Sequence, residues 1–456
     1  MGHASLHHAS TGRFQALTTG RHIRTPTTRV VRPAGQRKGR AVSSATYRTL
    51  LRTPGATAFF LTATTGRLGI AMTGLGIVWL VHGQTGSYAV GGLVTGGFAV
   101  AEALVGPQLA RLIDHFGQTR VLPPVLLAHA AAVVSLLALV ENGSPPWLMT
   151  AAGALVGATI PQLGALSAAR WSALLQGERT AALPTAFALE SLGNGLCYLA
   201  GPALISTVGA NSGPAHGMAL ATTLVVGGGL AFAAQRRTAP ATATATADAA
   251  AGRRRAGRSL LRSGFAAQVG INLTLGLYFG AVQVSVTAFA VEHGTAGTAA
   301  PLYAVSNCAG LLAGWLYGLR RWRAAPQAQL ALVAAGLALG CLPLLVADSV
   351  PELGLTLAVT GLAVPPILVL SSVLTAASVH RAALTQAFTW LNSASAAGAA
   401  AAAALSGRAV DAYGAHGGFA IAVAATSAMA VLAANHARAA SGRRTDSEPP
   451  PHIPTT

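Results

Sequence analysis

Twelve long apolar runs constrain this chain more than any other feature of its sequence. A helix that crosses the roughly 30 Å hydrocarbon core of a bilayer needs about 20 apolar residues. Gly and Pro recur inside these runs, as membrane helices tolerate, and the runs are far longer than the roughly 10 residues of a barrel strand. The expected spans are 56–81, 86–109, 121–140, 147–169, 183–208, 216–234, 264–291, 299–319, 327–347, 353–375, 383–405 and 417–437. We therefore predict an all-α polytopic membrane protein.

The charge content excludes several other classes of protein. Only 9% of the residues are charged, whereas soluble globular chains carry about a quarter. Too few charged residues remain to cover a soluble enzyme of this size, so we expect the lipid bilayer, and not nucleic acid, as a partner. Three scattered cysteines in apolar runs predict neither disulfides nor a metal site. The chain contains no Walker A sequence, so we expect neither ATP-driven transport nor a cofactor.

The basic residues predict the orientation of the chain. Of the 30 Lys and Arg residues, 28 lie in the two tails and in the loops on one side of the expected spans. The loops on the other side hold only Arg408, and Arg67 lies within the first span. This asymmetry is typical of positive-inside insertion. We expect a multi-pass protein of the plasma (inner) membrane with both termini in the cytoplasm.

The expected spans divide into two sets of six. The longest inside loop contains the low-complexity Ala-Thr run 241–246, which is typical of a linker. The two sets also show a weak parallel repeat: Ala186-Phe187 and Ala387-Phe388 lie 201 residues apart at matching places in their sets. The predicted parts are a disordered basic tail 1–54, a six-helix half 55–235, a cytoplasmic linker 236–262, a six-helix half 263–437 and a disordered tail 438–456. The first tail could instead be an organellar transit peptide or follow from a start codon placed too far upstream.

The loop after the second span carries the most specific motif, from Gly106 to Arg120. It resembles the signature loop of the major facilitator superfamily, G-x-L-x-D-R-x-G-x-(R/K). Leu112, Asp114 and Gly117 match this pattern. The departures are Ala110 for the first Gly, His115 for the usual Arg, and Thr119 for the final basic residue, whose charge Arg120 could supply.

This resemblance implies twelve helices in two six-helix halves and a secondary transporter. The chain also resembles a bacterial, drug-exporter-like branch of this superfamily at Gly86-Ser87-Tyr88, Arg170-Trp171, the run from Ala186 to Ser191 and Gly201-Pro202. Gly201-Pro202 in the fifth span is similar to the antiporter motif of drug exporters. The signature loop would then be a conformational latch of Ala110, Leu112, Asp114, Gly117 and Arg120. Independently of the family, a carboxylate at the inside end of a span can pair with a basic group or with a helix N-terminus. The alternative is a topogenic charge cluster without a switching role.

Four ionisable residues stand out within the spans, where a charge is costly and defaults to a functional hypothesis. Arg67, Glu102, His129 and Glu190 share a depth within roughly 6 Å. Arg67 could pair with Glu102 or Glu190. Two interpretations follow: one glutamate takes up and releases a proton as a cavity alternates, or the charges pair permanently and fix helix packing. For His129 we favour a packed polar residue over a proton relay.

Further polar positions within the spans are candidates for the lining of a central cavity. Each could equally make a helix–helix contact. These residues are Gln162, Asn194, Asn272, Gln386, Trp390 and Asn392.

Together these features predict a monomeric alternating-access transporter that exports a small, partly apolar molecule in exchange for protons. One alternative is an importer of a sugar, amino acid or other metabolite. Another is a non-transporting receptor or scaffold, which would need no titrating carboxylate. A membrane-embedded enzyme is disfavoured because the spans hold few His, Asp and Glu residues.

Overall fold

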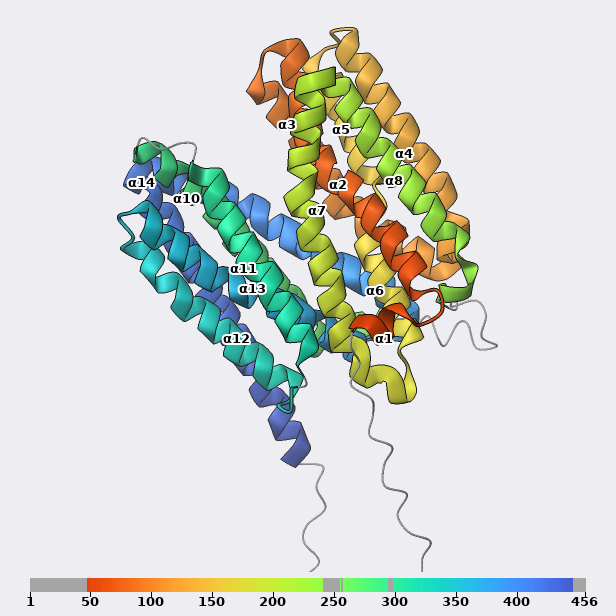
Figure 1. Cartoon of the computed structure of the whole chain (residues 1–456), viewed down its shortest axis with the longest axis vertical. Helices are drawn as coiled ribbons and strands as arrows, with labels where there is room; N and C mark the ends of the chain where they lie inside the picture. The colour runs from red at the N-terminus through yellow and green to blue at the C-terminus, as the bar shows by residue number, and fades with distance from the viewer. Residues whose placement is uncertain (1–46, 241–254, 256, 294–297, 321, 446–456) are drawn as a thin grey trace, which may run out of the picture. The chain divides into compact units, whose positions relative to one another are not determined.

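The computed structural model describes residues 47–240, 255, 257–293, 298–320 and 322–445 (Figure 1), and its regular elements in these ranges are all helices. Ten of the described segments are long and apolar enough to cross a membrane. One of them, Arg381–Ser441, contains two helices, because Gly414 interrupts it with a φ of 68°. Helix α7 (Leu183–Ser212) adds a further 30-residue helix. Helices therefore occupy all twelve predicted spans.

The helices follow the predicted order with ends that lie within a few residues of most expected boundaries. The first half contains α2 (Ala56–Thr85), α3 (Tyr88–Phe116), α4 (Gln118–Glu141), α5 (Pro146–Thr159), α6 (Leu163–Leu174), α7 and α8 (Pro214–Ala234). The second half contains α10 (Ser263–Glu292), α11 (Ala299–Leu319), α12 (Pro326–Cys341) with the 3-10 turn η5 (Leu342–Leu345), α13 (Val350–Ser378) and α14 (Leu384–Thr445).

The fourth span is not the continuous helix that the sequence predicts. Helix α5 ends at Thr159 and α6 begins at Leu163, so residues 160–162 are not helical. Pro161 explains the break, because a proline disfavours the helical conformation at the preceding residue and lacks an N–H group. Ile160 indeed has extended backbone angles, with φ of −67° and ψ of 127°.

The described ends of the two predicted tails differ from the expectation of disorder. Helix α1 (Tyr47–Leu51) lies inside the range 1–54, and it is anchored by Leu50, which is 3% exposed. Helix α14 continues to Thr445, beyond the expected end at residue 437, because no proline interrupts it before Pro449. Residues 1–46 and 446–456 of the tails lie outside the described part of the chain.

The predicted linker is ordered at both of its described ends. It begins with the 3-10 turn η2 (Arg236–Thr238). Near its other end, the hydroxyl of buried Ser259 accepts a hydrogen bond of 3.0 Å from the backbone N–H of His380. The Ala-Thr run lies within 241–254, outside the described residues.

The helices pack mainly against others of the same half, and a second set of helix contacts joins the two halves. Within the first half α2 packs mainly against α8 and α3 against α5, whereas in the second half α10 packs against α14 and α11 against α13. Between the halves, α14 contacts α3 and α6, and α7 contacts α11 and α13. We call one end of the helices the basic end, because it carries Arg52, Arg111, Arg120, Arg179 and Arg381.

Candidate functional site

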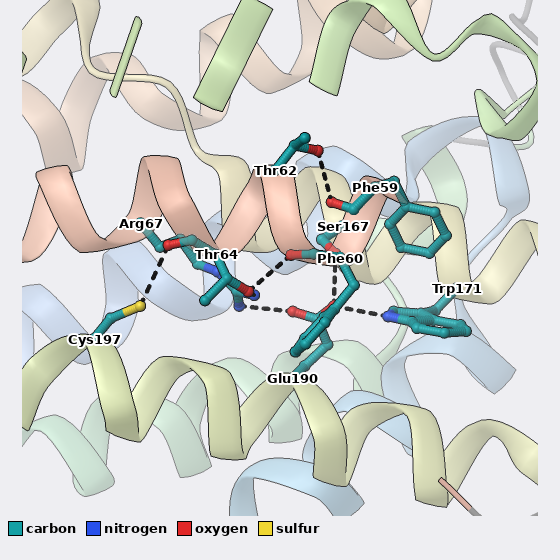
Figure 2. Close-up of polar contacts among 9 residues, drawn as sticks. All are labelled: Phe59, Phe60, Thr62, Thr64, Arg67, Ser167, Trp171, Glu190 and Cys197. Atoms are coloured by element: carbon teal, nitrogen blue, oxygen red, sulfur yellow. Dashed lines mark hydrogen bonds and ion pairs between the residues drawn. The ribbon is translucent and has the colours of Figure 1, made fainter. Parts of the chain in front are cut away.

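A buried ion pair lies at the centre of the first half. Figure 2 shows Arg67 of α2 facing Glu190 of α7, with 2.6 Å between Arg67 Nη1 and Glu190 Oε2. The two side chains are only 7% and 10% exposed. The second guanidinium nitrogen, Nη2, donates to the hydroxyl of Thr64 at 3.0 Å, one turn earlier on α2. Of the two predicted partners of Arg67, the structure thus selects Glu190.

The Glu190 carboxylate is held by donors from a third helix as well. Ser167 Oγ and Trp171 Nε1 donate to Glu190 Oε1 at 2.5 and 2.7 Å (Figure 2). They lie one turn apart on α6, so both side chains reach the same oxygen. A carboxylate with one cation and two further donors is fully satisfied in its ionised form. This geometry favours permanent pairing for Glu190.

Glu102 has a different environment on α3. It is partly buried, and its Oε1 accepts a hydrogen bond of 3.1 Å from Gln162 Nε2. No ion pair to Glu102 occurs among the described residues. Gln162 lies in the break between α5 and α6, where the backbone is not helical. An unpaired carboxylate beside an interrupted span is an arrangement that ion-coupled transporters use.

The pair of Glu102 and Gln162 lies next to the second half of the chain. Gly106 is one turn from Glu102 on α3, and a methyl group at Gly106 would meet Thr389 of α14 at 3.4 Å and Gln162 at 3.6 Å. A movement of α14 against α3 would therefore change the surroundings of Gln162, and through it those of Glu102.

The signature loop joins the two halves at the basic end. Asp114, near the end of α3, accepts a hydrogen bond of 2.9 Å at Oδ2 from the backbone N–H of Gln386. Gln386 lies in the first turn of α14, where N–H groups have no partner within the helix and the macrodipole is positive. Of the two predicted kinds of partner for Asp114, the structure shows the helix N-terminus.

The other residues of the predicted latch differ in their backbone conformation and in their burial. Gly117 links α3 to α4 with a φ of 94°, a conformation that glycine adopts without strain. Ala110 is 1% exposed and packs in the interior, whereas Leu112 is 44% exposed. Arg120 is exposed and forms no ion pair with Asp114 in the described part of the chain, and its role as the basic residue of the motif stays a prediction.

Two candidate cavity residues instead contribute to helix packing. Asn272 is 5% exposed, and its Nδ2 donates to Ser371 Oγ at 2.7 Å, which joins α10 to α13. His129 is fully buried, with Nδ1 at 3.4 Å from Thr159 Oγ1. For Asn272 the structure shows the helix–helix hydrogen bond that was its alternative role, and a cavity role stays a prediction.

The remaining cavity candidates have more accessible side chains. Asn194 is partly buried, Trp390 is 39% exposed and Asn392 is exposed. Gln386 is partly buried and lies at the basic end, where its backbone serves Asp114. A cavity role for Asn194, Trp390 and Asn392 stays a prediction.

Sequence reasoning missed the donors that surround the ion pair and a second buried arginine. Ser167 and Trp171 lie four residues apart on α6, but that spacing alone does not indicate a carboxylate partner. Arg170 is fully buried and donates to Gln118, Thr238 and the carbonyl of Phe232 at 2.8–3.0 Å. Its guanidinium carbon also lies 3.7 Å from the centre of the Phe232 ring. It holds η2 and α8 against the basic ends of α4 and α6.

The comparisons with known proteins agree on the fold. No protein-family model and no curated protein matches the sequence. Among solved structures, the human organic anion transporter MFSD10 (TETRAN) is 16% identical, with a TM-score of 0.62 over 83% of this chain and 98% of that one. A bacterial homologue of the iron transporter ferroportin, in an outward-facing state, is 10% identical, with a TM-score of 0.69 over 84% and 99%.

A third structure is that of FucP, a major facilitator superfamily transporter in the outward conformation. It is 15% identical, with a TM-score of 0.60 over 83% of this chain and 98% of that one. At these identities the likeness shows the fold and not the cargo, and it does not extend to a drug-exporter branch. The helix order, the two six-helix halves and these matches together show that the chain has the major facilitator fold.

Proposed function

We propose that the chain is a secondary active transporter that works by alternating access and exports a small, partly apolar molecule in exchange for protons. Its place would be the plasma (inner) membrane, with both termini and the basic end in the cytoplasm. The similar structures support transport of a small molecule. They do not favour one cargo, since an organic anion transporter, an iron transporter homologue and a fucose:proton symporter are all among them.

The contact between Glu102 and Gln162 carries the coupling part of this proposal. Buried carboxylates without a cation are costly in ionised form, so Glu102 favours a proton when the site is closed. Opening of the site to water stabilises the charged form and releases the proton. Gly106, one turn from Glu102 on α3, lies beside both Gln162 and Thr389 of α14, so a movement of the halves would reach the contact between Glu102 and Gln162.

Glu190 serves a different role in this mechanism. Arg67, Ser167 and Trp171 already satisfy its carboxylate, so a proton would have to displace a 2.6 Å ion pair. We assign Glu190 to the rigid frame of the first half and Glu102 to proton exchange.

The deciding experiment compares flux in a panel of compounds with and without a protonophore. Cells that contain the wild-type chain should extrude at least one panel compound, inverted vesicles should accumulate it, and the protonophore should abolish both fluxes. Glu102→Gln should reduce proton-driven flux by about 100-fold or more while counterflow exchange of the same compound persists, because exchange needs no net proton movement. Glu141→Gln is the matched control, since Glu141 is exposed at the end of α4.

Other outcomes would select among the alternatives. Accumulation in energised cells would indicate an importer, and full proton-driven flux in Glu102→Gln would remove Glu102 from coupling. If no compound moves across the membrane in either direction while the purified chain still binds a panel compound, the receptor function becomes the better account.

A further inference from the structure

Helix α1 precedes the first span, yet its first residue contacts the second half of the molecule. The hydroxyl of Tyr47 donates to the backbone carbonyls of Trp315 and Gly314 on α11, with oxygen–oxygen distances of 3.0 and 3.2 Å. Burial raises the pKa of Tyr47 to about 12, so the hydroxyl remains a donor across the physiological pH range. Leu50, one turn later on the same face of α1, is buried in the hydrophobic core.

Gly318 of α11 makes room for this contact. A methyl group at Gly318 would overlap the Tyr47 hydroxyl and approach Ala188 of α7 to 2.7 Å. Thr185, also on α7, donates to the Gly318 carbonyl at 3.0 Å. Elements α1, α7 and α11 therefore meet at one small residue, at the basic end and between the two halves.

We propose that α1 is a strap of the gate at the basic end: Tyr47 docks on α11 when this end is closed and must release whenever it opens. The inference rests on the proposed alternating-access function. It assigns Tyr47 a positioning role, because among the described residues its hydroxyl bonds only to backbone carbonyls of α11 in the second half. The strap lies at a different helix pair from the contact between Asp114 and α14, so the gate has two independent fastenings.

The test measures the gate directly by pulsed electron spin resonance between two spin labels. Arg179→Cys and Arg323→Cys place the labels on exposed loop residues of opposite halves, and Cys308→Ala removes the exposed native cysteine. In this background, Tyr47→Phe removes one hydroxyl and leaves the ring in place. Loss of a neutral hydrogen bond should lower the ratio of closed to open molecules about three- to tenfold.

Tyr317→Phe is the matched control. Tyr317 lies next to Gly318 on the same helix, but its hydroxyl donates to Gln329 Oε1 at 2.9 Å within the second half. This variant should leave the label distances unchanged. A pair of truncations gives a second measurement: deletion of residues 1–45 spares α1 and should have no effect, whereas deletion of residues 1–51 removes it and should open the gate.

The outcomes separate the strap from the transport proposal. Wild-type protein with two distance populations and an unshifted Tyr47→Phe distribution would overturn the strap alone. A single distance for every variant, with or without transported compound, would instead contradict alternating access. A shift in Tyr47→Phe as small as that in Tyr317→Phe would also reject the strap.

Discussion

At the scale of single residues, the ion pair of Arg67 and Glu190 predicts strongly non-additive mutations. Glu190→Gln leaves the Arg67 guanidinium buried without its counter-charge, and such a loss typically costs about 3–5 kcal/mol. Arg67→Met should be similarly destabilising, because it strands the carboxylate. The double variant Arg67→Met/Glu190→Gln should recover a large part of this loss, since neither charge remains buried. Thermal unfolding of the four proteins in one detergent measures the cycle.

If the losses of stability in the two single variants add up in the double variant, Arg67 and Glu190 do not stabilise the fold as a direct pair. Each residue would then contribute through its other contacts. Thr64→Val is a useful control, because it leaves both charges in place and removes only the Thr64 hydroxyl, which accepts from Arg67 Nη2 at 3.0 Å and donates to the Phe60 carbonyl at 2.8 Å. It should cost about 1–3 kcal/mol, as expected for two hydrogen bonds.

The residue scale also shows what the sequence could predict. The high cost of charge in a bilayer singled out Arg67, Glu102 and Glu190, but spacing could not tell which glutamate faces the arginine. That choice depends on the rotation of α2, α3 and α7 about their axes, which mostly apolar spans do not encode. The repeat at Phe187 and Phe388 marked two residues that do lie close together, because their rings meet across the halves with centroids 5.8 Å apart.

At the scale of elements, glycines set how closely α10 and α14 pack. A methyl group at Gly276 or at Gly280 of α10 would overlap the carbonyl oxygen of Ser395 or Ala399, respectively, on α14. Small residues four apart let backbones approach in this way. We expect Gly280→Ala to lower the free energy of unfolding by about 2–3 kcal/mol, because backbone must move to admit the methyl group.

The control for this packing prediction is Gly336→Ala on α12, where no heavy atom lies within 4 Å of the added methyl group. It should be neutral or should stabilise by up to about 1 kcal/mol through helix propensity. If chemical denaturation shows the same change in the free energy of unfolding for both substitutions, α10 and α14 do not pack closely enough at Gly280 to exclude a methyl group.

The positions of the helices were largely predictable from the sequence, with the break in the fourth span as the exception. Span length and hydropathy placed the helices, because the bilayer demands about 20 apolar residues whatever the tertiary fold. The interruption at Pro161 was not anticipated, since membrane helices often continue through proline when neighbours satisfy the backbone. Pro161 allows the break, and the contact of Gln162 with Glu102 joins elements that the local sequence does not relate to each other.

At the scale of the whole molecule, the basic end holds the halves together by contacts that the sequence only partly indicated. The signature loop predicted a role for Asp114 and two kinds of partner, but not the α14 N-terminus as the one used. Arg381, in the 3-10 turn η6 (Arg381–Ala383) before α14, adds a hydrogen bond of 2.7 Å to Gln176 in the first half. Such contacts depend on which ends of distant helices meet, and a local pattern of residues cannot predict this arrangement.

The contact between Asp114 and α14 leads to the last prediction, which concerns the equilibrium between the two states of the molecule. Asp114→Asn keeps an oxygen that can accept from the Gln386 N–H but removes the charge that favours the positive helix terminus. A loss of about 1 kcal/mol corresponds to a roughly fivefold lower ratio of closed to open molecules. The labels at positions 179 and 323 should show that shift, and transport should slow while thermal stability is retained.

The matched control is Asp348→Asn, whose side chain is 88% exposed and approaches only His416, at 3.9 Å. It should change neither the label distances nor the rate. If the Asp114→Asn protein matches this control in both measurements, Asp114 is a topogenic charge and not a latch. If Asp114→Asn and Tyr47→Phe each shift the equilibrium, their combination should multiply the two effects, because Asp114 acts on α14 and Tyr47 on α11 without a shared partner.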